Sequence, residues 1–193
     1  MFANMDSAII IDDDLISSKD LKDFIEQQCL MPRTFVYSGE ASGVSDEYNP
    51  MFVHCLKDEN NIHSNLFFVF APLISLMMSK HNMKYKSPES IFRQRLFFQP
   101  ASVRSDDYIH DQNLHVDWLD LSHYVMIYYV NDSDGGTWLY DKTEKNQTDY
   151  KLIKFIDHKK GRIILFDGKH YHAGSKPTNS TRIVINTNIL KDF

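Results

Sequence analysis

The stretch YVMIYYVNDSDGGTWLY, residues 124–140, sets the expectation for the fold. Two runs rich in β-branched and aromatic side chains, 124–130 and 137–140, flank a turn of Asn, Asp, Ser and Gly residues. This arrangement predicts two strands joined by a turn. Four more runs of the same composition lie before and after this stretch, with no helical pattern between them: 92–98, 152–156, 162–166 and 182–189. Such spacing predicts an antiparallel sandwich or barrel.

The first half of the chain has a different pattern. Three isoleucines at 9–11 predict a short strand. An amphipathic helix is expected to begin near Ser17 and to end at Pro32, and a second helix is expected over 65–81. Residues 39–61 contain scattered Gly, Ser, Asn and Asp, and predict an irregular loop that is either a lid or a plain surface connection. We therefore expect a mainly β fold with N-terminal helices packed on its outside.

Composition limits the class of protein. The chain has 193 residues, a hydrophobic content of 42% and a net charge of −5. This size and balance predict one soluble domain, and the acidic charge does not favour a nucleic-acid partner. The start of the chain lacks the basic region of a signal peptide, and the longest apolar run, 66–78, is too short to span a membrane. Cys29 and Cys55 form no CxxC pattern, so we expect free thiols in a reducing cytoplasm.

The run 182–189 places polar side chains on one face of a strand. Side chains alternate along a strand, so one face is expected to hold Arg182, Val184, Asn186 and Asn188, and the other Ile183, Ile185, Thr187 and Ile189. If the polar face lines the inside of a barrel, the fork of the Arg182 guanidinium suits a carboxylate ligand. The alternative is an exposed edge strand with Arg182 in solvent.

His115 and Asp117 are separated by one residue. In an extended segment their side chains project to the same side and can meet one ion. A second imidazole is available from His170 or His172, which follow the run 162–166. Two histidines and one carboxylate that leave coordination positions open are the ligand set of non-haem Fe(II) oxygenases.

Three motifs in this order resemble the Fe(II)/2-oxoglutarate-dependent oxygenases, in particular the prolyl-hydroxylase-like branch. The first is His115-x-Asp117, then a histidine about 55 residues further on, then Arg182, which resembles the family pattern HxD…H…R/K. The second is IYYVN at 127–131 followed by GGT at 135–137, and the third is GRIILFDG at 161–168. The resemblance covers roughly residues 90–190. Spacing to the arginine and position relative to Phe166 favour His172 over His170 as the distal ligand. His170 is then expected either behind the ligands, where it would support them, or at the rim of the site.

The resemblance implies a double-stranded β-helix, a cupin-like jelly-roll barrel supported by helices. It implies a single oxygenase domain, 1–193, in which 1–90 supply helical support and loops and 91–193 form the jelly-roll core. His115, Asp117 and His172 would hold Fe(II). The expected contacts to 2-oxoglutarate are Arg182 and the Tyr128 hydroxyl at its distal carboxylate, with Asn186 and Asn188 as further co-substrate or pocket residues.

The activity implied by the resemblance is that of a dioxygenase that converts 2-oxoglutarate and O2 to succinate and CO2. The expected substrate is a peptide or a small molecule. The group that becomes hydroxylated is a peptidyl prolyl residue or another amino-acid-like group. Ascorbate is a candidate reductant. Two alternatives remain. One is a catalytically inactive jelly-roll binding module. The other is a zinc hydrolase with a metal-bound water, in which Arg182 and Tyr128 would have no role.

Overall fold

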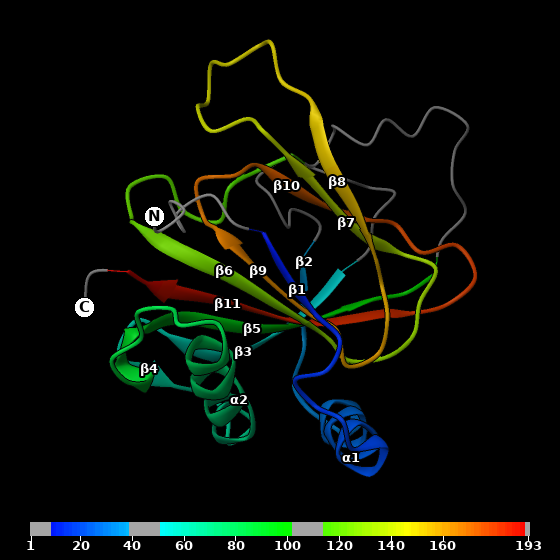
Figure 1. The fold of residues 1–193 in the computed structure, drawn as a ribbon. Helices are drawn as coiled ribbons and strands as arrows, with labels where there is room; N and C mark the ends of the chain where they lie inside the picture. The colour runs from blue at the N-terminus through cyan, green and yellow to red at the C-terminus, as the bar shows by residue number, and fades with distance from the viewer. Residues whose placement is uncertain (1–8, 39–50, 102–113, 192–193) are drawn as a thin grey trace.

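Two antiparallel sheets form the fold, one of eight strands and one of three (Figure 1). The structure is a computed structural model that describes residues 9–38, 51–101 and 114–191. The larger sheet has the order β1 (Ile10–Asp12), β9 (Ile163–Asp167), β6 (His123–Tyr129), β11 (Arg182–Leu190), β5 (Ile91–Gln99), β3 (Met51–Asp58) and β2 (Val36–Ser38), and β4 (Asn61–Ile62) pairs with β3. The smaller sheet has the order β10 (His172–Ser175), β7 (Gly136–Tyr140) and β8 (Leu152–Asp157). This architecture confirms the predicted mainly β fold.

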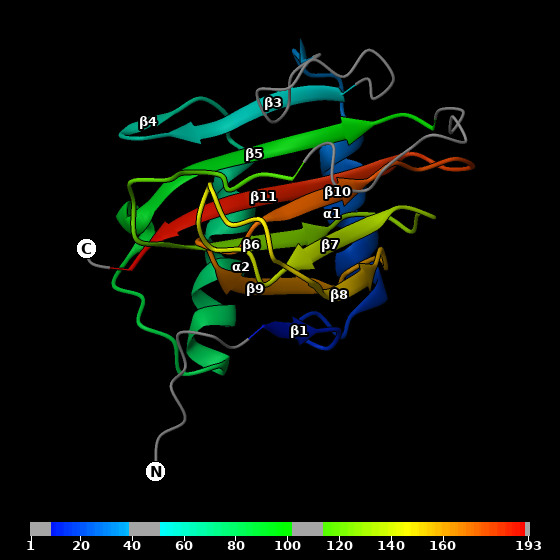
Figure 2. The ribbon, with the colours of Figure 1, turned by 90° about the horizontal axis from the view of Figure 1, so that it is seen from above.

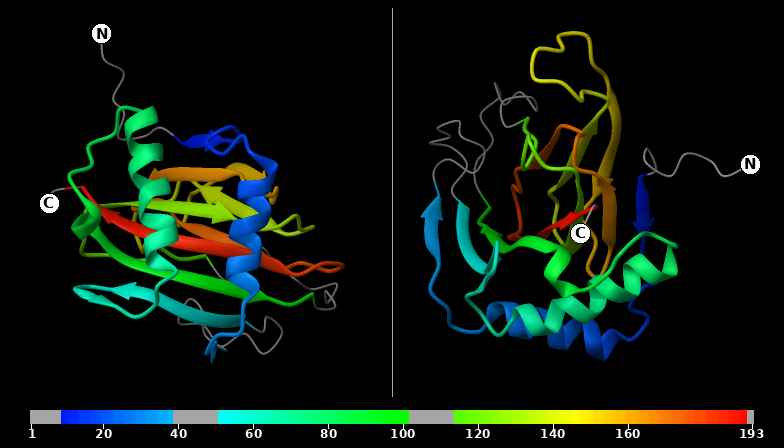
Figure 3. Two further views of the ribbon diagram at one scale, coloured as in Figure 1. Left: turned by 90° about the horizontal axis from the view of Figure 1, so that it is seen from below. Right: turned by 90° about the vertical axis from the view of Figure 1, so that its left-hand side faces the viewer.

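The helices cover only one face of the larger sheet. Helices α1 (Lys19–Leu30) and α2 (Phe67–Lys80) lie across it, as Figure 3 shows from below. The smaller sheet lies on the opposite face (Figure 2). A 3₁₀ turn, η2 (Pro88–Ser90), leads into β5. The start of α1 is fixed by Ser18, whose Oγ accepts a hydrogen bond from the Leu21 backbone N–H at 3.2 Å. Both predicted helices are therefore confirmed.

Two hydrophobic cores lie on either side of the larger sheet. The helix-side core joins α1 and α2 to side chains that include Met126, Tyr128, Ile183, Ile185 and Ile189. The core between the sheets contains Val125, Ile127, Tyr129, Leu139 and Phe166. All seven residues of β6 are buried because this strand is covered on both faces. The smaller sheet has a more exposed outer strand, β8, where Leu152 and Ile153 are 44% and 43% exposed.

The prediction of an irregular loop over 39–61 is wrong for its second part. Residues 51–58 form β3, which lies inside the larger sheet between β2 and β5. Its register with β5 shifts between Cys55 and Lys57, and this irregularity weakens the alternating pattern in the sequence. The first half of the chain thus contributes strands to the sheet as well as helices and loops. Residues 39–50, where a lid was one of two expectations, lie outside the described part of the chain.

Tyr128 lies on the helix side of β6, so its expected place in the pocket is wrong. Its ring packs against Phe70 of α2, with the ring centroids 5.6 Å apart. Alternation along β6 puts Tyr124, Met126 and Tyr128 on one face, and this face contacts the helices. The Tyr128 hydroxyl is buried and has no hydrogen-bond partner among the described residues. Burial raises the pKa of this hydroxyl.

The two neighbouring tyrosines provide a matched test of this register. Tyr128→Phe removes a buried, unpaired hydroxyl and should leave the free energy of unfolding unchanged or raise it by up to about 1 kcal/mol. Tyr129→Phe removes a 2.7 Å hydrogen bond to Thr137 Oγ1 and should lower it by about 1 kcal/mol. Urea denaturation followed by circular dichroism measures both. A larger loss in Tyr128→Phe than in Tyr129→Phe would contradict the register.

Candidate metal centre

Two histidines from distant parts of the chain are joined through their backbones. His115 lies in the segment before β6, and His172 is the first residue of β10. The His115 N–H donates to the His172 carbonyl at 3.1 Å, and the His172 N–H donates to the His115 carbonyl at 2.9 Å. This reciprocal pair is the closed unit of an antiparallel ladder, and it fixes the two Cα positions opposite each other. The imidazole rings consequently lie with their centroids 4.7 Å apart.

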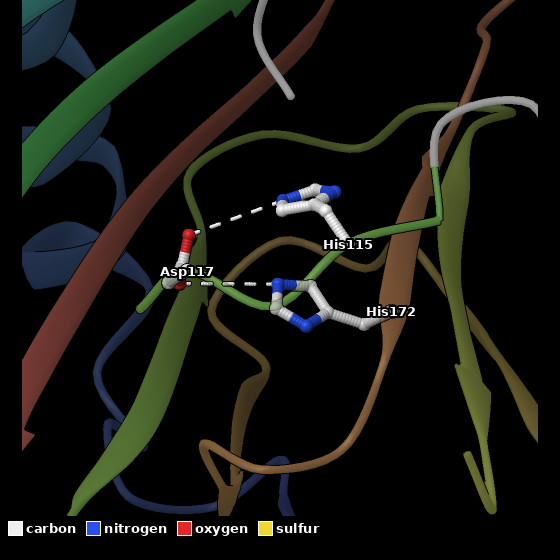
Figure 4. A group of neighbouring side chains, drawn as sticks. All are labelled: His115, Asp117 and His172. Atoms are coloured by element: carbon white, nitrogen blue, oxygen red, sulfur yellow. Dashed lines mark ion pairs between the residues drawn. The ribbon is translucent and has the colours of Figure 1, made fainter. Parts of the chain in front are cut away.

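Asp117 completes a group of three potential metal ligands (Figure 4). Its Oδ1 lies 3.9 Å from His115 Nε2, and its Oδ2 lies 3.8 Å from His172 Nε2. One ligand atom from each residue falls within 4.8 Å of the other two. His172 Nε2 is buried and has no hydrogen-bond partner in the described part of the chain. A divalent cation between this nitrogen and the carboxylate would satisfy both, so the three residues fit a metal ion.

The protonation state of His172 suits metal binding. Its Nδ1 lies 3.2 Å from the carbonyl oxygen of His170. A carbonyl only accepts hydrogen bonds, so Nδ1 carries the proton and Nε2 presents its lone pair to the site. Burial, together with the nearby His115, lowers the pKa of His172 to about 4. The imidazole is therefore neutral at physiological pH, as a metal ligand must be.

His170 lies outside the group of three. Its own side chain is buried, with Nδ1 3.2 Å from the carbonyl oxygen of Tyr140. The geometry thus brings His172, and not His170, to His115 and Asp117. The contribution of His170 to the site is its backbone carbonyl, which orients the His172 ring.

Four side chains hold the Asp117 carboxylate. The amide nitrogens of Asn186 and Asn188 donate to Oδ2 at 3.0 and 2.9 Å, from two inward positions of β11. Arg93 and Arg95 of β5 approach Oδ1 at 3.6 and 3.7 Å. Burial opposes ionisation of Asp117, but the surrounding His172, His115, Arg95 and Arg93 hold its pKa well below the usual range. The two asparagines were expected beside the co-substrate, and the structure places their amides on Asp117.

Arg182 lies in the same pocket as the three candidate ligands. Its guanidinium donates to Gln99 Oε1 at 3.5 Å and to Thr137 Oγ1 at 3.4 Å, and Thr137 also accepts from the Tyr129 hydroxyl. Only 5% of Arg182 is exposed. Gly174 makes room for it, since a Cβ there would lie 3.2 Å from Arg182 Nη1. The alternative of an exposed edge strand is therefore excluded.

Four polar side chains in or beside the pocket were not expected from the sequence: Arg95, Gln99, Tyr129 and Thr137. Gln99 lies directly opposite Arg182 in the register between β5 and β11. A sequence alone does not show which strands pair, so Gln99 carried no signal. Tyr129 did carry a signal, because alternation places it on the opposite face of β6 from Tyr128, so one of these two tyrosines lies on the pocket side.

No family model matches the chain, and no curated protein matches it. Solved structures do match over nearly its whole length. A prolyl hydroxylase from Trichoplax adhaerens in complex with a peptide of hypoxia inducible factor has a TM-score of 0.63 at 16% identity, over 96% of this chain and 84% of that one. An oxidoreductase of the 2OG-Fe(II) oxygenase family from Burkholderia pseudomallei has a TM-score of 0.64 at 11% identity, over 97% and 86%.

A third structure with this fold has a different activity. The epimerase SnoN, in complex with Fe3+, alpha ketoglutarate and nogalamycin RO, has a TM-score of 0.60 at 9% identity, over 96% of this chain and 80% of SnoN. The chain therefore has the double-stranded β-helix fold of the 2OG-Fe(II) oxygenases, with a His-Asp-His group that could hold iron.

The two nearby histidines allow a direct test of the metal centre. His172→Ala removes one of three ligands and should abolish tight binding of Fe(II), or of Mn(II) as its redox-inert substitute. His170→Ala keeps the carbonyl that orients His172 and should bind the metal within a few-fold of the unmodified protein. Anaerobic calorimetric titration measures both affinities, with circular dichroism as the check of folding. Loss of binding in His170→Ala alone would refute the assignment.

Proposed function

We propose that this protein is an Fe(II)- and 2-oxoglutarate-dependent dioxygenase that hydroxylates a peptidyl prolyl residue or another amino-acid-like substrate. The reaction would use O2, release succinate and CO2, and take ascorbate as a candidate reductant. One observation carries the proposal. A His-Asp-His group and a buried arginine line a single pocket, and a metal with open positions beside a fixed guanidinium suits a co-substrate with a carboxylate at each end.

In this proposal His115, Asp117 and His172 hold the iron, which when bound supplies the activation of O2. The residues of this chain fix the position and charge of the reactants. Asn186 and Asn188 restrain Asp117, so the carboxylate stays ionised and oriented. Arg182 pairs with the distal carboxylate of 2-oxoglutarate. Thr137, which accepts hydrogen bonds from Arg182 and Tyr129, lies at this end of the pocket in place of the expected Tyr128.

The residues of the pocket also separate the proposal from its two alternatives. A zinc hydrolase would need the metal and a bound water, and it would give Arg182 no role in the pocket. An inactive binding module would need neither the neutral His172 nor the ionised Asp117 at the same point. O2-dependent consumption of 2-oxoglutarate distinguishes the dioxygenase from both.

The similarity to a peptide-bound prolyl hydroxylase supports an amino-acid-like substrate. A cytoplasmic location and action as one domain over 1–193 are parts of the same proposal. Cys29 and Cys55 are free thiols, as a reducing compartment requires. No helix within the described ranges is long and apolar enough to cross a membrane.

Reconstitution tests the activity. The purified chain is loaded with Fe(II) and 2-oxoglutarate without oxygen and then exposed to O2. Succinate formed in proportion to O2 consumed supports the proposal, and mass spectrometry across proline-containing peptides and free amino acids identifies the product that gains one oxygen atom. A folded chain that binds neither metal nor 2-oxoglutarate and forms no succinate would favour the inactive module.

Co-substrate affinity provides a second prediction. Arg182→Met removes a charge-assisted pair in a buried site and should weaken 2-oxoglutarate binding by about 2–5 kcal/mol. Tyr129→Phe should cost about 1 kcal/mol by loosening Thr137, whereas Tyr128→Phe should have no effect. Anaerobic calorimetry on the Mn(II)-loaded protein measures all three. An unchanged affinity in Arg182→Met would remove the main support for this family of reactions.

A further inference from the structure

Arg95 is a second arginine that lines the pocket. It projects from β5 to the same side as Phe97, and its guanidinium lies 4.8 Å from the centre of that ring. Its Nη2 is 3.7 Å from Asp117 Oδ1, which is longer than a hydrogen bond. About 23% of the side chain is exposed. The guanidinium thus reaches the metal end of the pocket while part of it remains accessible.

The neighbouring Arg93 shows what a fully engaged guanidinium looks like at this position. Its Nε donates to Asn188 Oδ1 at 3.1 Å, and its Nη2 donates to the Asp117 carbonyl at 3.2 Å. It also covers the ring of Trp118 at 5.3 Å. By contrast, the structure shows no hydrogen bond from the Arg95 guanidinium to any residue that it describes. Arg93 therefore supports Asp117, and Arg95 has donors to offer a ligand.

The charges around the pocket also indicate that Arg95 can bind an anionic ligand. Among the residues that the structure describes, three guanidinium groups and one carboxylate surround the pocket: Arg93, Arg95, Arg182 and Asp117. In the proposed function Arg182 pairs with the distal carboxylate of the co-substrate, and Arg93 and Arg95 share the single charge of Asp117, at 3.6 and 3.7 Å. One carboxylate cannot compensate both of these guanidinium groups. Two guanidinium groups that share one carboxylate in a largely buried site are only partly compensated, and an anionic ligand would lower the cost of their burial.

We propose that the substrate carries a carboxylate and that Arg95 binds it beside the metal. The planar fork of a guanidinium matches a carboxylate better than a neutral amide, and the stacking on Phe97 holds the fork in one plane. This inference rests on the proposed function and narrows it to acidic substrates. Arg95 is then the residue that selects the substrate, whereas Arg182 selects the co-substrate.

A fluorinated carboxylate tests the inference without knowledge of the substrate. The full chain is loaded with Mn(II) and saturating 2-oxoglutarate, so the Arg182 end is filled. The paramagnetic metal shortens the ¹⁹F relaxation time of any probe that binds near it. Trifluoroacetate should bind and relax, and trifluoroacetamide, which has the same size and no charge, should not. Arg95→Met should weaken trifluoroacetate binding about tenfold or more, and Arg95→Lys should retain part of it.

Lys154→Met is the matched control, since it removes one positive charge from an exposed position of β8. It should leave the relaxation of both probes unchanged. Equal relaxation of trifluoroacetate in the unmodified protein and in Arg95→Met would overturn the inference. So would a loss of 2-oxoglutarate affinity in Arg95→Met as large as that in Arg182→Met, because Arg95 would then belong to the co-substrate site. Failure of the unmodified protein to bind Mn(II) and 2-oxoglutarate would refute the proposed function itself, and this inference with it.

Discussion

The reciprocal pair of backbone hydrogen bonds between His115 and His172 is the constraint on which the site depends. The two residues are far apart in sequence, and one belongs to a segment outside the sheets. Because the contact is made by backbone groups, it sets the separation of the two imidazoles without using either side chain. Neither imidazole ring is used to make this contact. Asp117 then needs only to lie two residues beyond His115 for its carboxylate to face both nitrogens.

Other side chains of the pocket stabilise the negative charge of Asp117. Asp117 is buried, and a buried carboxylate is stable as an ion only if donors and cations surround it. The asparagines of β11 supply the donors, and the arginines of β5 supply the cations. These two strands are direct neighbours in the larger sheet, so one antiparallel register delivers both sets. The same register sets Gln99 opposite Arg182 at the other end of the pocket.

The sequence was most informative where local pattern and local chemistry agree. Alternation along 182–189 predicted the faces of β11, and the HxD spacing predicted that His115 and Asp117 would converge. It failed where the answer depends on which elements pack together. The sequence does not show which of Tyr128 and Tyr129 faces the pocket, because this depends on which face of β6 the helices cover. β3 lacks a clean period because its register shifts, and its stability comes from pairing with β5. Arg95 looked like an ordinary polar position until β5 was placed beside β11.

The two sheets also differ in how well their strands tolerate substitutions. Substitutions in β6 or β11 must satisfy the helix-side core and the pocket at once, because both faces of these strands are covered. The smaller sheet supplies Thr137, Gly174 and His172 to the pocket, yet its outer strand β8 has largely exposed side chains. Mutations can therefore accumulate on β8 at little cost in stability and still shift β7, which pairs with it and borders the pocket. Divergence of specificity, in nature or by directed evolution in the laboratory, has its easiest route through this sheet.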